Sequence, residues 1–101
     1  MMMKNDVIEL VITSTEVDDV GDTIQSITYK KIFAEKKSIG TSEFYQAHSE
    51  GLKPTYKFVI DPLEYTTDIT HIKYEEDIYK IIRTYEKNIT DLEITVEKDI
   101  H

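Results

Sequence analysis

The sequence contains no cysteine and no tryptophan, and it has only three glycines and two prolines among its 101 residues. Without cysteine, the chain can form neither a disulfide nor a thiolate metal site. It has no apolar run near the roughly eighteen residues that a membrane-spanning helix needs. Residues 1–6 lack the apolar core of a signal peptide. We therefore expect a cytoplasmic protein that makes no membrane contact.

Basic residues are also scarce, since 12 lysines and arginines stand against 20 aspartates and glutamates, which gives a formal net charge of −8. Lysine and arginine contacts to phosphate supply most of the affinity of nucleic-acid-binding proteins. This balance argues against DNA or RNA binding as the main activity. It allows DNA to pass nearby without sequence-specific binding.

Groupings typical of catalysis are missing as well. The three histidines lie far apart in the sequence, and none has a partner at metal-ligand spacing. There is no nucleophile motif and no glycine loop of the kind that holds phosphate. We therefore expect a protein that is not an enzyme, with no catalytic residues, no bound metal and no cofactor.

The dominant pattern in the sequence is an alternation with a period of two residues, rich in β-branched and aromatic side chains. Such runs, separated by turn residues at short intervals, are typical of a small all-β barrel or sandwich. In the second run, the step from Ile24 to Ile27 breaks the alternation and predicts a bulge near Ser26. One domain is expected over residues 1–101, with about six antiparallel strands at 7–13, 24–35, 56–60, 69–74, 78–85 and 92–97.

A long polar segment, residues 36–53, interrupts these strands. Connections of this length in small domains are usually functional or disordered, and fully extended this one would reach at most about 55 Å. Residues 42–49 have the pattern of a short helix that Ser42 could cap and Gly51 could end. The aromatic pair Phe44-Tyr45 is expected either to project with the loop as a contact surface or to fold back over an open barrel end.

Several short sequence motifs also follow one another in a specific order along the chain. An aromatic-alanine pair ends one strand, a Ser-Glu-aromatic motif follows, and a Gly-Leu-Lys-Pro turn precedes an aromatic strand. In this order the chain resembles the head–tail adaptor family of long-tailed bacteriophages, also called head-closure or stopper proteins. It departs from that family in having no tryptophan in the second strand and no basic residues in the first. The pieces that carry the resemblance are residues 32–35, 42–47, 51–54, 56–58, 79–85 and 91–93.

The resemblance implies a small β-barrel assembled as a ring below the portal, which closes the DNA-filled head and offers the tail a docking surface. The implied partners are a portal-side adaptor protein, a tail-side protein (tail terminator or tube) and further copies of the chain. The implied location is the head–tail interface of the virion, after assembly in the host cytoplasm. Other possibilities are a different neck or tail component, such as a tail terminator, or an OB-like nucleic-acid-binding module whose strand tyrosines stack on bases.

Candidate interface residues follow from the long segment and from one strand. If the chain forms a ring, the aromatic and aliphatic side chains of the 36–53 segment would make adhesive contacts with neighbouring copies or rings. The two glycines of this segment would act as hinges. A strand arginine between apolar neighbours is a further candidate, because arginine and tyrosine are enriched where binding energy concentrates. The candidate interface residues are Ile39, Gly40, Glu43, Phe44, Tyr45, Gly51 and Arg83.

Overall fold

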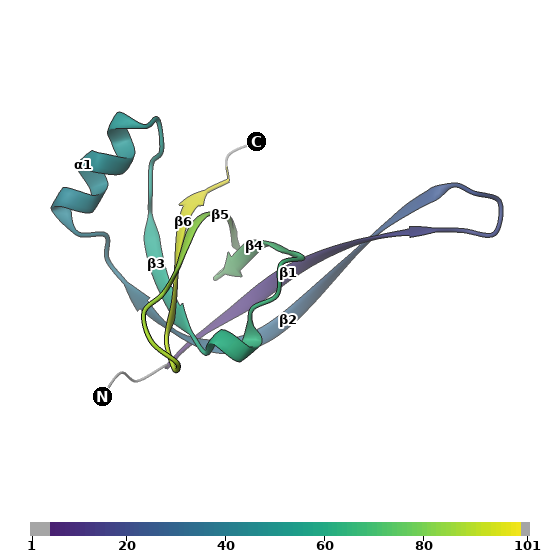
Figure 1. The fold of residues 1–101 in the computed structure, drawn as a ribbon, viewed down its shortest axis with the longest axis horizontal. Coiled ribbons are helices and arrows are strands. Elements are labelled where there is room, and N and C mark those ends of the chain that lie inside the picture. Colours follow the sequence, from purple (N-terminus) through teal and green to yellow (C-terminus); the bar gives the residue numbers. More distant parts are fainter. Residues whose placement is uncertain (1–4, 100–101) are drawn as a thin grey trace.

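Six antiparallel strands close into a barrel, and one short helix lies outside it, in a computed structural model that describes residues 5–99 (Figure 1). The predicted all-β barrel is therefore confirmed. Residues 1–4, where no signal peptide is expected, lie outside the described part. Around the barrel the strands follow the order β1-β2-β3-β6-β5-β4. The elements are β1 (Asp6–Val17), β2 (Thr23–Lys37), α1 (Thr41–Ser49), β3 (Tyr56–Ile60), the 3-10 turn η1 (Pro62–Glu64), β4 (Ile69–Tyr74), β5 (Asp77–Glu86) and β6 (Leu92–Lys98).

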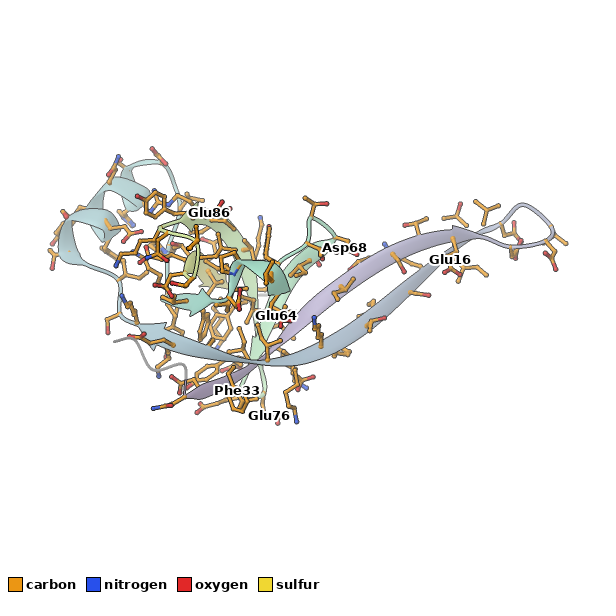
Figure 2. The ribbon with its side chains drawn as sticks, turned by 60° about the horizontal axis from the view of Figure 1, so that its bottom comes forward. Glu16, Phe33, Glu64, Asp68, Glu76 and Glu86 are labelled. Atoms are coloured by element: carbon orange, nitrogen blue, oxygen red, sulfur yellow. The ribbon has the colours of Figure 1, made fainter. Side chains whose placement is uncertain are left out.

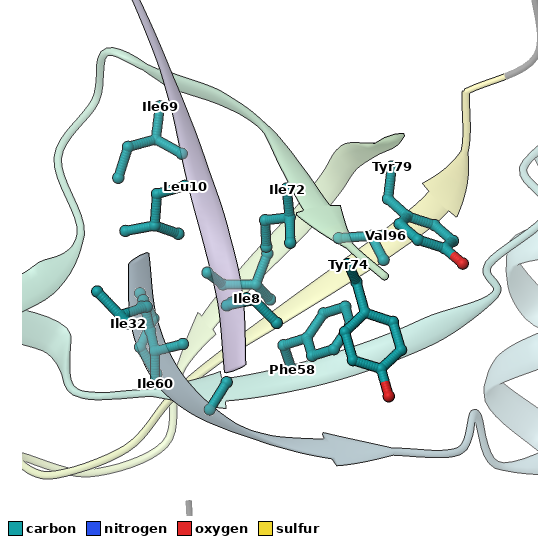
Figure 3. Close-up of a cluster of buried hydrophobic side chains, with 13 residues drawn as sticks. Ile8, Leu10, Ile32, Phe58, Ile60, Ile69, Ile72, Tyr74, Tyr79 and Val96 are labelled. Atoms are coloured by element: carbon teal, nitrogen blue, oxygen red, sulfur yellow. The ribbon is translucent and has the colours of Figure 1, made fainter. Parts of the chain in front are cut away.

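The barrel interior is filled by the side chains that alternate inward along the strands (Figure 3). Phe58 of β3 lies at the centre and is completely buried. Its ring packs against Tyr74, with the centroids 5.3 Å apart, and against Tyr56 at 6.1 Å. Burying one such large apolar side chain contributes about 1.5–3 kcal/mol. The other large, fully buried side chains of this core cluster are aliphatic and come from β1, β3, β4 and β6: Ile8, Leu10, Ile60, Ile72, Ile94 and Val96.

Strands β1 and β2 are longer than the barrel needs. β1 pairs with β4 only over residues 9–12, and β2 pairs with β3 only over residues 35–37. β1 and β2 pair with each other from Asp6 and Ala34 out to Val17 and Thr23. Residues 14–27, which we name the hairpin arm, therefore leave the barrel as a two-stranded ribbon. Its side chains, Glu16 among them, stand in solvent on both faces (Figure 2).

The turn at the end of the hairpin arm is held by its own aspartate. The Oδ1 atom of Asp18 accepts the backbone N–H of Val20 at 3.0 Å and of Asp22 at 2.8 Å. Gly21 adopts φ +87°, a left-handed conformation that glycine takes at little cost. The predicted strands at 7–13 and 24–35 leave residues 14–23 as their connection, whereas β1 continues to Val17 and β2 begins at Thr23, so the turn lies far from the barrel.

The predicted bulge near Ser26 is wrong, because the β1–β2 register runs without a shift through that residue. Ile24 and Ile27 simply point to opposite faces of a ribbon that has solvent on both sides. No buried face therefore forces them into alternation. Register shifts occur elsewhere, between Val11 and Ile12 where β1 meets β4, and between Ile81 and Arg83 where β5 meets β6.

Candidate functional site

The segment at residues 36–53 is mostly folded, since β2 continues to Lys37 and α1 occupies Thr41–Ser49. The short-helix interpretation of residues 42–49 is therefore confirmed, although Ser42 lies within the helix and does not cap it. The N-cap is Gly40, which has extended backbone angles and offers no side-chain hydrogen bond. A helix this short is marginal by itself and depends on tertiary contacts.

The C-terminal end of α1 is capped by a Schellman motif around Gly51. Gly51 has φ +82°, its N–H donates to the carbonyl of His48, and the N–H of Leu52 donates to the carbonyl of Ala47. These two bonds satisfy carbonyls that the last helical turn would otherwise leave unpaired. Gly40 and Gly51 thus mark the two ends of α1.

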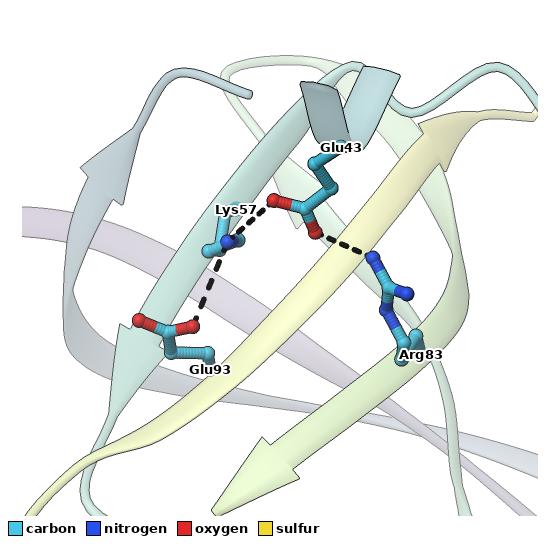
Figure 4. Close-up of polar contacts among 4 residues, drawn as sticks. All are labelled: Glu43, Lys57, Arg83 and Glu93. Carbon is cyan, nitrogen blue, oxygen red and sulfur yellow. Dashed lines mark hydrogen bonds and ion pairs between the residues drawn. The ribbon is translucent and has the colours of Figure 1, made fainter. Parts of the chain in front are cut away.

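A charged cluster fastens α1 to the outside of the barrel, and we name it the helix latch (Figure 4). Glu43 of α1 accepts hydrogen bonds from Lys57 Nζ of β3 at 2.7 Å and from Arg83 Nη2 of β5 at 2.5 Å. The same Lys57 Nζ lies 3.6 Å from Oε1 of Glu93 on β6. The Glu43 carboxylate therefore connects the helix to β3 and β5, and Lys57 extends the cluster to β6.

Electrostatics in the latch favour the ionised form of Glu43. The hydrogen bond from Lys57 lowers the pKa of the Glu43 carboxyl below its usual value, and Lys57 and Arg83 lower it further through their charges. Partial burial acts in the opposite direction but is outweighed. Since a lowered pKa keeps the Glu43 carboxyl ionised at neutral pH, the latch is closed there.

The aromatic pair of α1 faces solvent. The side chains of Phe44 and Tyr45 are 39% and 67% exposed, and their rings meet edge to face with centroids 5.9 Å apart. The ring of Phe44 also stacks on His48 one turn later, at 5.8 Å. Ala47 is the residue by which α1 packs. The alternative in which the aromatic pair forms a lid over the barrel end is therefore wrong.

A lysine of β2 covers that end of the barrel instead. Lys36 Nζ lies 4.9 Å from the ring centroid of Tyr56 and 5.2 Å from that of Tyr74. A hydrogen bond to Tyr74 raises the pKa of the Lys36 ammonium, and burial raises the pKa of the neighbouring Tyr79 hydroxyl. The aromatic groups at the barrel mouth thus contact one another and a cation from their own chain.

The structure brings together only some of the residues that the sequence singled out. Glu43 and Arg83 meet in the latch, so Arg83 serves an internal contact. Ile39 is half-buried just before α1. Sequence reasoning missed Lys57 and Glu93, because charged residues on the outward face of a strand look like ordinary solvated positions.

Within residues 5–99, no three histidine or acidic side chains are grouped closely enough to hold a metal ion. In the same range, no helix has the length and apolar character needed to cross a membrane. Around α1, the structure places two exposed aromatic rings on a helix that ion pairs fasten to the barrel.

Comparison with known proteins gives a fold and no family. The sequence matches no protein-family profile and no curated protein. Among solved structures, the chain is similar to the solution structure of protein SF1141 from Shigella flexneri 2a, with a TM-score of 0.71 and 19% sequence identity. That match covers 97% of this chain and 96% of the other. At this identity the likeness supports a shared fold alone.

Proposed function

We propose that this protein is a structural component of a bacteriophage head–tail connector, where it forms a ring that closes the DNA-filled head and gives the tail a docking surface. The observation that carries the proposal is the placement of exposed apolar side chains. Of the twelve large apolar side chains that are exposed in residues 5–99, six lie on two elements that leave a filled barrel in different directions, α1 and the hairpin arm (Figure 1). A joining piece between protein rings needs contact surfaces on more than one side.

In this proposal, α1 provides the contact with a neighbouring ring, on the portal side or the tail side. Phe44 and Tyr45 supply apolar area at little conformational cost, because they sit on a helix that Glu43 already fastens to the barrel. The ordered motifs that resemble the head–tail adaptors support the same role. No reaction and no cofactor belong to the proposal, and DNA passes through the ring without being held.

Removing α1 tests this role. Lys37 and Lys57 are paired neighbours on β2 and β3, so residues 38–39 and 51–55 can close the connection after deletion of residues 40–50. The barrel should still fold, while heads assembled with the shortened protein should lose DNA or fail to accept tails. A matched control replaces residues 40–50 by a glycine-serine linker of equal length. If virions assemble normally with either variant, the proposed role of α1 is wrong.

Two rival functions are separated by simple binding experiments. A tail terminator should bind isolated tails before heads, whereas the proposed connector should bind DNA-filled heads first. An OB-like module should shift single-stranded DNA at moderate salt with micromolar or better affinity. Three of the candidate stacking rings, Tyr56, Tyr74 and Tyr79, contact one another at the barrel mouth, which does not favour the OB-like alternative.

A further inference from the structure

The hairpin arm is a second contact element that the sequence did not reveal. Its side chains Val17, Val20, Ile24 and Ile27 are 70%, 80%, 47% and 58% exposed. Along the arm neither strand has a second neighbour among the described residues, since β1 leaves β4 and β2 has not yet reached β3. Exposed apolar side chains on an unsupported ribbon are typical of a surface that is covered in an assembly.

The charge of the hairpin arm indicates what kind of surface binds it. Residues 14–27 contain four acidic residues, Glu16, Asp18, Asp19 and Asp22, and no lysine or arginine. The arm therefore carries a net charge of −4 at its far end, and its natural partner is a basic surface. Such a surface should also have room for the apolar side chains of the turn.

The same chain offers a surface of this kind on its barrel. A cavity of about 400 Å³ opens between the segment that follows α1 and the end of β6. We name it the lysine pocket, and its lining residues are Gly51, Lys53, Thr55, Lys80, Glu97, Lys98 and Asp99.

The lysine pocket contains three lysines and two acidic residues, and each acidic residue has a contact within its own chain. Glu97 accepts the backbone N–H of Lys53 at 2.9 Å, and Asp99 lies 3.1 Å from Nε2 of His71. Within residues 5–99, neither the Lys53 nor the Lys80 ammonium group has an ion-pair partner within 4 Å. Two cations are thus available for an incoming carboxylate.

We infer that the hairpin arm of one copy docks in the lysine pocket of the next. The arm points away from the barrel on the side opposite α1, whereas the pocket lies beside the end of α1, so the two cannot meet within one chain (Figure 1). Contact between different surfaces of identical copies is head-to-tail, and such contacts generate a ring when the rotation closes. The inference rests on the proposed ring and names the contact that builds it.

Charge reversal gives a sharp test. One variant carries Glu16→Lys and Asp19→Lys in the arm, and leaves Asp18 in place because it holds the turn. The other carries Lys53→Glu and Lys80→Glu in the pocket. Each variant alone places like charges in contact, so we expect self-association at least about tenfold weaker than in the wild type. A one-to-one mixture restores opposite charges at every arm–pocket contact, and it should associate again.

The measurement is sedimentation velocity at low ionic strength over a range of protein concentrations, with circular dichroism to show that both variants are folded. Carbodiimide cross-linking of mixed ¹⁴N and ¹⁵N protein should join Asp19 or Glu16 of one copy to Lys53 or Lys80 of another. The inference is overturned if the wild type stays monomeric, if the mixture does not recover, or if the pocket variant loses affinity for an oligonucleotide while self-association is unchanged.

The arm–pocket contact and the connector role are tested separately, because the connector role is measured by binding to DNA-filled heads. If the protein binds heads but shows no arm–pocket contact, the contact is wrong and the connector role stands. If the charge-reversed mixture recovers and no head binding occurs, the contact stands and the connector role is wrong.

Discussion

Replacing Glu43 by glutamine removes the charge that fastens α1 while keeping nearly the same shape. The substitution weakens two charge-assisted hydrogen bonds, to Lys57 and to Arg83. Such bonds contribute about 1.5–3 kcal/mol when well buried, but the side chain of Arg83 is half exposed and Lys57 keeps Glu93 as a partner. We therefore expect a loss below that range, about 1 kcal/mol, which in a domain of this size lowers Tm by roughly 4–8 °C.

The pH dependence of this loss follows from the lowered pKa of Glu43. A carboxyl whose pKa is lower in the folded state contributes stability that is present above its unfolded value, about 4.3, and is lost as the pH falls through the folded value. The stability difference between wild type and Glu43→Gln should thus be complete at pH 7. It should shrink once the pH falls below about 4.

Urea denaturation at pH 7 and at a series of acidic pH values measures the difference, and hydrogen exchange locates it. Amides of Thr41–Ser49 should exchange about fivefold faster in the variant if 1 kcal/mol is lost from the docking of α1. The control is Glu50→Gln, which removes the same charge from the C-cap of the same helix, where no ion pair is broken within the described residues. Equal effects of the two substitutions would refute the latch.

Two backbone positions give further predictions. Gly51→Ala should destabilise the protein by about 1 kcal/mol in urea denaturation, because φ is +82° there and open space around the residue leaves conformation as the cause. Glu75 and Glu76 form a two-residue connection between paired Tyr74 and Asp77 with φ of 55° and 82°, the signs of a type I′ turn. Replacing them with Asn-Gly should raise the free energy of unfolding by about 1 kcal/mol, seen as a higher urea midpoint. An unchanged midpoint would contradict the idea that these two glutamates are held in a strained conformation.

Much of the barrel could be predicted from the sequence, because the inward-facing residues of each barrel strand are apolar and recur with a period of two. Tyr56, Phe58 and Ile60 are an example, since all three point inward as their spacing predicts. The hairpin arm could not be found in this way. Its residues have solvent on both faces, so they lack the alternation of apolar and polar residues that marks a half-buried strand. The length of the hairpin arm therefore cannot be predicted from that alternation.

The candidate site was predictable in its local features and not in its long-range ones. Gly40, Gly51 and the aromatic pair stand out in a short window of sequence, and the structure places them at the ends and on the exposed side of α1. The pairing of Glu43 with Arg83 joins residues 40 positions apart. It depends on β5 and β3 lying on the same side of a closed barrel, which no local pattern specifies.

The central claim is that this chain joins DNA-filled heads to tails through exposed aromatic side chains on a rigid barrel. The most direct measurement adds purified protein to DNA-filled heads that lack it, and follows DNA retention and tail attachment. Wild-type protein should bind the heads and restore both, while Phe44→Ala/Tyr45→Ala should keep its Tm and fail to restore them. Heads that retain DNA and accept tails equally well with the double variant, or wild-type protein that does not bind heads, would contradict the account.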